Sequence, residues 1–376
     1  MIKILISGDY SPRGRVADVI EAGDYDSIFK DIRELNATAD YSIVNFESVI
    51  ADDSDKAIKK NGPSLRCTPK SLDALKWAGF QMLTLANNHF YDYGDSAILK
   101  SFEAIDKAGF DRVGAGINAT EAAKILYKEI KGKRFAFINC CEHEFSIAGE
   151  THGGCNPLDP IKQYYAITEA RDKADYVIVI VHGGHEHFQL PSPRMKETYR
   201  FFIEAGADAV INHHQHCFSG YEYYKDKPIA YGLGNLCFDF GTTLNQTWYE
   251  GYVLQLKFDN EKIKLELHPY EQCKQTPTVT LLKDCKAFNQ HIQELNAIIT
   301  DNKKLYQYVA EFYDNSSQGF LSIFEPYTNR YLSAARHRHL IPSTIGQKRI
   351  SRALNSLLCE SHLDRLRHAV LRRFDS

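Results

Sequence analysis

The chain lacks the features that would indicate several common classes of protein. Its nine cysteines are scattered without a CxxC pair, so neither a zinc ribbon nor a dithiol redox motif is predicted. No apolar run is long enough to span a bilayer, and the stretch 1–8 is too short for the apolar part of a signal peptide. The formal net charge of −3 argues against a general electrostatic affinity for nucleic acid. We therefore expect a cytoplasmic protein with reduced thiols, no membrane span and no nucleic-acid partner.

What the chain does contain is the composition and periodicity of an α/β protein. Hydrophobic residues make up 44% of the 376 residues and charged residues 25%, which is ample for a folded core. Short β-branched runs alternate with helical patterns, and this alternation predicts a layered α/β domain. The predicted strands are 2–7, 41–46, 80–86, 135–139, 176–181, 209–211, 229–235, 252–258 and 262–268. The predicted helices between them are 28–36, 69–78, 96–108, 161–173 and 195–205.

The character of the sequence changes after about residue 280. Helical patterns at 288–299, 305–312 and 351–374 replace the strands, and arginine and histidine become frequent from 330 onward. We therefore predict two domains, an α/β domain over 1–280 and a basic helical extension over 281–376. The excess of positive charge is most simply a solvated face, and an acidic surface or a partner helix of another protein is the alternative.

Side chains that suit metal ions follow many of the predicted strands. They are Asp9, Glu47, Asn88, His89, His182, His214 and His216. Because the loops of an α/β sheet converge at the carboxyl ends of its strands, these side chains are expected to lie together. Mixed carboxylate, amide and imidazole ligands suit one or two hydrolytic divalent ions. The alternative is a set of buried polar residues and helix caps along the rim of the sheet.

The densest group is the histidine cluster that follows the strand 209–211. His214 and His216 are one residue apart, so on an extended backbone both side chains would point the same way. Imidazole binds zinc, manganese, iron, copper and nickel, so the pair does not identify the metal. A histidine-rich surface loop is the other interpretation of this stretch.

Six short motifs occur in one order over roughly residues 1–245. They are Gly8-Asp9, Asn45-Phe46-Glu47, Leu85-Ala-Asn-Asn-His89 with Asp92-Tyr-Gly94, His182-Gly-Gly-His-Glu186, Asn212-His-His-Gln-His216, and Tyr231-Gly-Leu-Gly-Asn235 with Phe238-Asp239. This ordered set resembles the CapA family of capsule or poly-γ-glutamate synthesis proteins, and that family resembles a branch of the calcineurin-like metallophosphoesterases. The resemblance implies a metallophosphoesterase-like fold and a metal-dependent hydrolase linked to capsule, polysaccharide or poly-γ-glutamate biosynthesis.

The resemblance also implies roles for particular residues. The implied metal ligands are Asp9, Glu47, Asn88, His182, His214 and His216, holding one or two ions of manganese, zinc or iron. His89 resembles the histidine that stabilises the attacking or leaving oxygen, and Glu186 is expected to contact substrate or to act as a base. The implied substrate is an anionic polymer, or a phosphoester or γ-glutamyl compound.

Two positions depart from the wider superfamily. Its opening Asp-x-His is Asp9-Tyr-Ser11 here, and its Gly-Asp carboxylate motif is replaced by Asn45-Phe46-Glu47. The loss of one histidine predicts either a single ion or a weak second one. The alternative function is accordingly a non-catalytic assembly or polymer-binding factor that retains a structural metal.

Overall fold

The computed structural model describes residues 1–240, 245–259, 262–321, 327, 329–338, 340–342, 344, 346–358, 366 and 370. The chain divides into two compact units, Met1–Tyr306 and Gln307–Ser376. This division comes later in the chain than the boundary predicted near residue 280.

Within the described residues, the first of two large sheets has eight strands and contains the N-terminal strand near its centre. The order is β18-β17-β16-β1-β2-β5-β6, and β15 also pairs with β1. Strands β2 and β15 run parallel to β1, whereas β16 runs antiparallel to it. The bounds are β1 (Ile2–Ser11), β2 (Tyr41–Phe46), β5 (Met82–Thr84), β6 (Asp111–Val113), β15 (Asn235–Phe238), β16 (Glu250–Phe258), β17 (Ile263–Gln272) and β18 (Val279–Leu281).

The second large sheet has six strands in the part of the chain that is described. Its order is β13-β14-β12-β11-β9-β8, with β9, β11, β12 and β14 parallel to one another. The bounds are β8 (Leu126–Ile130), β9 (Lys133–Cys141), β11 (Tyr176–His182), β12 (Ala209–His213), β13 (Tyr221–Tyr224) and β14 (Lys227–Ala230). Two small ladders join β3 (Val49–Ile50) to β4 (Arg66–Cys67) and β7 (Ala115–Gly116) to β10 (Gly154–Cys155).

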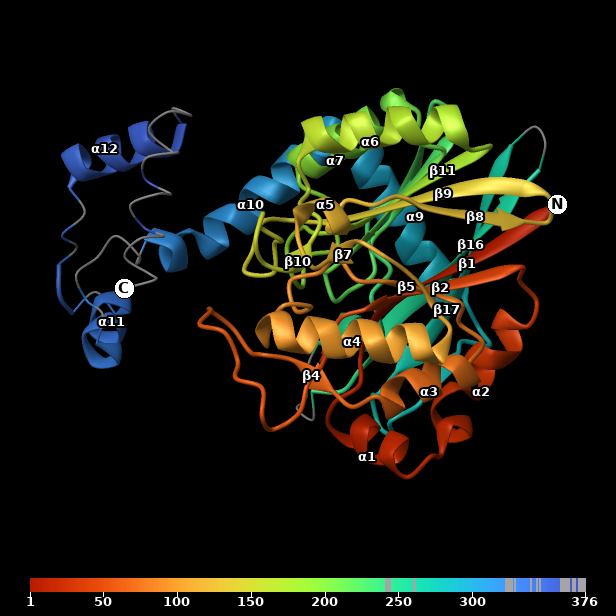
Figure 1. Ribbon diagram of the computed structural model, residues 1–376. Coiled ribbons are helices and arrows are strands. Elements are labelled where there is room, and N and C mark those ends of the chain that lie inside the picture. Colours follow the sequence, from red (N-terminus) through yellow and green to blue (C-terminus); the bar gives the residue numbers. More distant parts are fainter. Residues whose placement is uncertain are drawn as a thin grey trace. The chain divides into compact units, whose positions relative to one another are not determined.

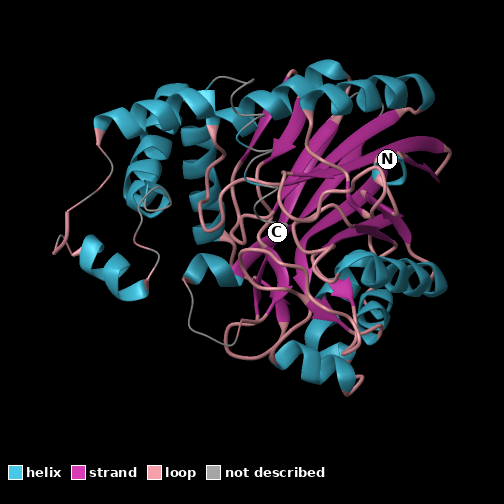
Figure 2. Ribbon diagram, turned by 60° about the vertical axis from the view of Figure 1, so that its left-hand side comes forward, coloured by secondary structure: helices cyan, strands magenta, loops and turns pink. Residues whose placement is uncertain are grey.

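Helices cover the outer faces of the two sheets (Figure 1). On the side of the first sheet these are α1 (Arg15–Glu21), α2 (Tyr25–Asn36), α3 (Lys70–Trp77) and α4 (Gly94–Ala108). On the side of the second are α6 (Pro160–Lys173) and α7 (Pro193–Ala205), and the strands lie between the helical layers in Figure 2. The shorter helices are α5 (Ala119–Ala122) and α8 (Gln246–Tyr249). Asp159 and Ser192 cap α6 and α7 directly before a proline, which is a favoured way to begin a helix.

The two sheets pack against each other through aromatic side chains. The ring of Phe258 on β16 lies 5.0 Å from Phe135 on β9 and 4.7 Å from Tyr176 on β11. The side-chain oxygen of Asn139 on β9 also accepts hydrogen bonds from the backbone N–H groups of Leu85 (3.1 Å) and Ala86 (2.7 Å), just beyond β5. These contacts bring the carboxyl ends of parallel strands from both sheets to the same edge of the unit.

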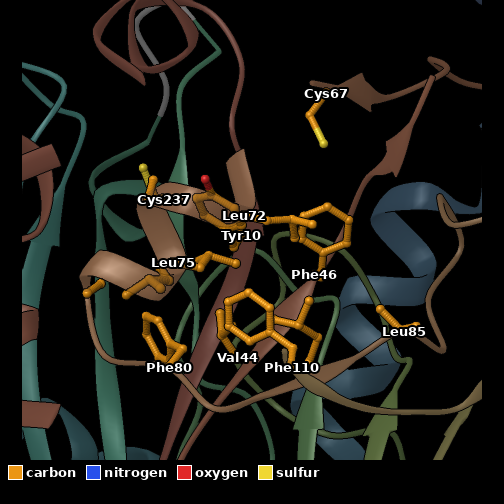
Figure 3. Packing of buried hydrophobic residues seen from close by; sticks show 14 of the residues in the cluster. Tyr10, Val44, Phe46, Cys67, Leu72, Leu75, Phe80, Leu85, Phe110 and Cys237 are labelled. Carbon is orange, nitrogen blue, oxygen red and sulfur yellow. The ribbon is translucent and has the colours of Figure 1, made fainter. Parts of the chain in front are cut away.

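The outer face of the first sheet packs against α1 to α4 in one hydrophobic cluster (Figure 3). Tyr10 and Phe46 from the strands meet Leu72 and Leu75 from α3, and all four side chains are buried. Burial of each such side chain stabilises the fold by roughly 1.5–3 kcal/mol. This packing fixes β1 and β2, and with them Asp9 within β1 and Glu47 directly after β2.

The prediction of an α/β fold is confirmed. The strands predicted over 252–258 and 262–268 are present as β16 and β17, which pair in antiparallel fashion. The single strand predicted over 229–235 is wrong, because the chain leaves the second sheet after Ala230 and enters the first at Asn235. The crossing uses Gly234 at a φ of 81°, and its carbonyl accepts the N–H of Asp9 at 3.1 Å. Glycine suits this backbone conformation because a side chain would be strained there.

The helix α9 (Lys286–Thr300) belongs to the first unit, although it follows the change in sequence character near 280. Its Phe288 ring lies 4.6 Å from Phe218, and Leu295 and Ile299 are buried. Asn296 accepts a hydrogen bond from the N–H of Tyr221 at 2.6 Å. The apolar stripe of α9 is therefore part of the core of the α/β unit.

The remaining helices are α10 (Asn302–Leu321), α11 (Arg330–His337) and α12 (Gln347–Leu358). The helix predicted over 351–374 is described up to 358, at 366 and at 370, and its other residues lie outside the described part of the chain. Among the residues that are described, no helix combines the length and apolarity needed to cross a bilayer.

Candidate metal centre

The first carboxylate of the centre, Asp9, is fixed by hydrogen bonds from two other elements. Its Oδ1 accepts from the Asn45 amide at the end of β2 (2.7 Å), and its Oδ2 accepts from the backbone N–H of His214 (3.1 Å). Asp9 is 1% exposed. The turn after β12 is thus tied directly to β1.

The second carboxylate, Glu47, is buried without a hydrogen-bond partner among the described residues. It is 0% exposed, and neither of its oxygens makes a hydrogen bond to any residue that the structure describes. Its Oε1 is 3.7 Å from His216 Nε2, 3.8 Å from His182 Nε2 and 4.0 Å from His89 Nε2, which is too far for hydrogen bonds. Burial, followed by the charge of Asp9, raises the pKa of Glu47 well above its usual range. A buried carboxylate in this condition is costly, and a bound cation would compensate it.

The imidazole of His182, at the end of β11, is oriented by amides on both sides. Its Nδ1 lies 3.1 Å from Asn45 Nδ2, so its Nε2 points to Asn88 Oδ1 at 3.1 Å. The same Nε2 lies 3.0 Å from His214 Nδ1. These contacts fix the orientation of the imidazole ring.

His214 and His216 lie together at the site, but the extended backbone expected between them is wrong. Strand β12 ends at His213, and His214 and His216 have φ values of 95° and 53°. A turn with left-handed residues therefore brings the two rings to 6.0 Å. Non-glycine residues in this conformation are strained, and such strain is concentrated at functional sites. The third member of the cluster, His213, instead places its Nε2 3.0 Å from the Ser7 carbonyl in the sheet interface.

The three central histidines favour the neutral form that binds metals. Burial lowers the pKa of His214 and His216 to about 4, and it lowers that of His182 well below the usual range. At neutral pH these imidazoles therefore keep a free ring nitrogen for a cation.

Among the residues that the structure describes, three groups of donor atoms have the spacing of a metal site, with the atoms of each group within 4.8 Å of one another. They are Glu47 with His182 and His214, Asp9 with Glu47 and His216, and Glu186 with His214 and His216. Glu47 belongs to two of the groups, so it would be shared between them if two cations were bound. Asn88 adds an amide oxygen beside the first group through its contact with His182. This set of donors suits one or two divalent ions of a metal that binds both imidazole and carboxylate ligands.

His89 lies beside the centre, and its ring contacts Asp92 and Lys60 on the side away from Glu47. Its Nδ1 is 2.7 Å from Asp92 Oδ2 and 3.2 Å from Lys60 Nζ, and its Nε2 faces Glu47. Lys60 forms an ion pair with Asp92 in which the two side chains are 4% and 0% exposed. Asp92 also accepts a hydrogen bond from the N–H of Leu65 at 2.6 Å. The aspartate therefore directs the Nδ1 proton away from the metal donors.

The open side of the centre carries acidic residues from two loops. Glu186 is exposed, yet one of its oxygens reaches His214 and His216. Glu144 Oε1 is 3.9 Å from His214 Nε2, and burial, followed by the charge of Glu186, raises the pKa of Glu144. Glu142 is held by Arg194 and by the N–H of Gly184 at 3.0 Å.

The structure therefore brings all predicted site residues to one place. Asp9, Glu47, Asn88, His89, His182, His214 and His216 are buried together, and Glu186 is at the rim. Their roles as ligands or catalysts stay predictions. Sequence reasoning missed Asn45, Lys60 and Glu144. Asn45 belongs to a recognised motif, whereas Lys60 lies in a polar loop with no pattern that would single it out.

Comparison with known proteins identifies the family of this chain. The family described as "Bacterial capsule synthesis protein PGA_cap" matches residues 3–240. The chain is similar to the capsule biosynthesis protein CapA of Bacillus anthracis, with 31% identity over 244 residues. It is also similar to the PGA biosynthesis protein CapA of Bacillus subtilis (strain 168), with 32% identity over 240 residues. The match covers 63% of this chain in both cases, and 59% and 63% of the two relatives.

Among solved structures, the chain resembles a novel phosphatase from Mycoplasma pneumoniae. The TM-score is 0.47 at 16% identity, with 78% of this chain and 98% of that chain covered. A putative 5′-nucleotidase from Staphylococcus aureus gives a TM-score of 0.43 at 14% identity, with 78% and 58% covered. Because these scores are below 0.5, the assignment rests on the match to residues 3–240, which contain every predicted metal ligand. The match confirms the resemblance seen in the ordered motifs: the chain belongs to the bacterial capsule synthesis protein PGA_cap family.

Proposed function

We propose that this chain is a metal-dependent hydrolase that acts in the synthesis of a bacterial capsule, polysaccharide or poly-γ-glutamate. The observation that carries the proposal is Glu47, a fully buried carboxylate without hydrogen bonds among the described residues and close to three histidines. A cation bound beside Glu47 would compensate this buried charge, which is why we propose that the activity depends on a metal.

The residues proposed to hold one or two cations of manganese, zinc or iron are Asp9, Glu47, Asn88, His182, His214 and His216. When bound, the cations would polarise a substrate oxygen and lower the pKa of a water molecule. Asn45 orients both Asp9 and His182 and thereby fixes one side of the centre.

His89 is proposed as the group that donates to developing negative charge. Asp92 accepts a hydrogen bond from the Nδ1–H of His89, which fixes the ring with Nε2 facing the centre. Lys60 holds the Asp92 carboxylate in place for this purpose.

The substrate is proposed to enter on the side of Glu186. This residue is exposed and still reaches two histidines of the centre, so it can contact the substrate or accept a proton from it. The substrate classes that we propose are phosphoesters and γ-glutamyl amides of an anionic polymer. The predicted cytoplasmic location and the predicted protein partner of the basic tail stay predictions.

A second function is favoured by one observation. Ser11 occupies the position where the wider superfamily has a histidine, and its hydroxyl is a poorer metal ligand than imidazole. With one ion held structurally, the chain would act as a non-catalytic assembly or polymer-binding factor. The two functions make different predictions for His89, which only the enzyme requires.

The experiment that tests the proposal begins with metal analysis of the purified protein. We expect at least one divalent transition metal per chain. The loaded protein is then assayed against a panel of phosphoesters and γ-glutamyl amides, with His89→Ala as the matched inactive control. Metal without turnover of any panel member would support the binding factor, and a protein that binds no metal would contradict both functions.

A further inference from the structure

The second unit contains a long stretch with charge of one sign. Residues 330–358 include six arginines and lysines and no aspartate or glutamate, although the whole chain has a formal net charge of −3. Such a stretch is attracted to an extended anionic surface. The stretch includes α11 and α12, and both helices expose apolar side chains.

The helix α12 (Gln347–Leu358) separates its apolar and cationic residues onto different faces. Ile350, Leu354 and Leu357 follow one another at the spacing of a single helical stripe, and they are 39%, 52% and 48% exposed. Lys348 and Arg352 are exposed and project from the opposite side of the helix. Three large apolar residues in water on a helix of this length are unfavourable unless something covers them.

We propose that α12 lies in the surface of a bilayer rich in anionic lipid. Its apolar stripe would enter the boundary between headgroups and acyl chains, and its cations would contact the headgroup phosphates. A helix of twelve residues is too short to span the bilayer, so it lies in the plane of the interface.

The apolar stripe distinguishes a lipid surface from other anionic partners. A soluble polyanion would pair with the cations but would leave Ile350, Leu354 and Leu357 in water. The groove of an acidic protein could cover one helix, yet the acid-free stretch extends over α11 as well. On α11, Tyr331 and Leu332 are 69% and 48% exposed beside Arg330. Aromatic and basic side chains together are typical of the membrane interface.

The proposal is tested by sedimentation of the full chain with vesicles. We expect binding to vesicles of equal parts phosphatidylglycerol and phosphatidylcholine, and little binding to phosphatidylcholine alone. Replacing Ile350, Leu354 and Leu357 by serine should weaken binding on the order of tenfold or more, because the cations remain but the apolar area is lost. The matched control replaces Leu99 and Ile161 by serine; they are 56% and 70% exposed in the first unit and should not matter.

A spectroscopic test reports which face of α12 contacts the lipid. Leu354→Trp should show a blue-shifted tryptophan emission when the anionic vesicles are added, and Arg352→Trp on the opposite face should not. Absence of binding to anionic vesicles would overturn the proposal. So would full binding by the triple serine variant, which would indicate attraction by charge alone, as for a soluble polyanion or an acidic protein. An equal loss in the Leu99 and Ile161 control would place the binding surface elsewhere and also overturn it.

Discussion

Two neighbouring groups in the candidate site differ in whether their buried carboxylate has partners within the protein. In the group formed by His89, Asp92 and Lys60, the buried carboxylate has a lysine, a histidine and a backbone N–H as partners. Glu47, nearby, has no hydrogen bond from any described residue and faces imidazoles that burial keeps neutral. The first group is electrostatically complete within the protein. The second group would be completed by a cation, and for this reason we propose the metal centre around Glu47.

The largest expected effect is the loss of the cation itself. The double substitution His214→Ala with His216→Ala removes donor atoms from every group that has metal-site spacing. We expect metal binding to fall by more than about 100-fold, since loss of an outer partner alone costs about 10–100-fold. Metal analysis after dialysis measures it, with His268→Ala on β17 as the control. A folded double variant that retains its metal would place the site elsewhere.

The second prediction concerns the complete group. Lys60→Met should leave the Asp92 carboxylate without its cation and destabilise the metal-free protein by about 3 kcal/mol. This is near the lower end of the usual cost because Leu65 and His89 still contact the carboxylate. Urea unfolding measures the effect, and Lys59→Met, which changes an exposed neighbour, is the control. Equal stability of the two variants would show that the ion pair contributes little.

The third prediction separates chemistry from metal binding. His89 hydrogen-bonds Asp92 through Nδ1 and belongs to none of the described groups with metal-site spacing, so His89→Ala should keep its metal. Its rate on the substrate found by the panel should fall by about 10²–10³, as for loss of one preorganised donor. Unchanged function of His89→Ala in the cell, together with loss of function in the His214 and His216 variant, would favour the binding factor.

The fourth prediction is smaller and concerns the residue before His89. Asn88 places its amide oxygen 3.1 Å from His182 Nε2, on the metal side of the centre. Asn88→Ala should therefore weaken metal affinity by about 10–100-fold, whereas Asn88→Asp should retain it because an oxygen donor remains. Titration with manganese measures both constants. An Asn88→Ala variant with unaltered affinity would leave Asn88 as a structural residue.

Much of the centre could be predicted because its residues follow buried strands. Apolar runs at 2–7, 41–46 and 176–181 locate strands, and parallel strands deliver Asp9, Glu47 and His182 to one edge. That inference needs only the alternation of the sequence and the direction of the strands.

Other features depend on backbone conformations and long-range contacts, which cannot be predicted from the hydrophobic periodicity of the sequence. His214 and His216 have left-handed backbone conformations and form a turn where an extended strand was expected. The turn, rather than the alternation of a strand, brings their side chains together. Lys60 comes from a polar loop whose path is set by long-range contacts with Asp92. Likewise α9 joins the α/β core through Phe218 and Tyr221, and composition near residue 280 carries no sign of this packing.

The measurement that tests the account most directly is thermal unfolding of Glu47→Gln with and without manganese. Without metal, the variant should be more stable than the wild type by about 1–3 kcal/mol, because an uncompensated buried carboxylate has been removed. Manganese should raise the melting temperature of the wild type and leave that of the variant nearly unchanged. Lys60→Met should show the opposite pattern, with lower stability and a retained response to manganese. A Glu47→Gln protein that is less stable without metal, or that manganese stabilises as much as the wild type, would contradict the assignment of the centre to Glu47.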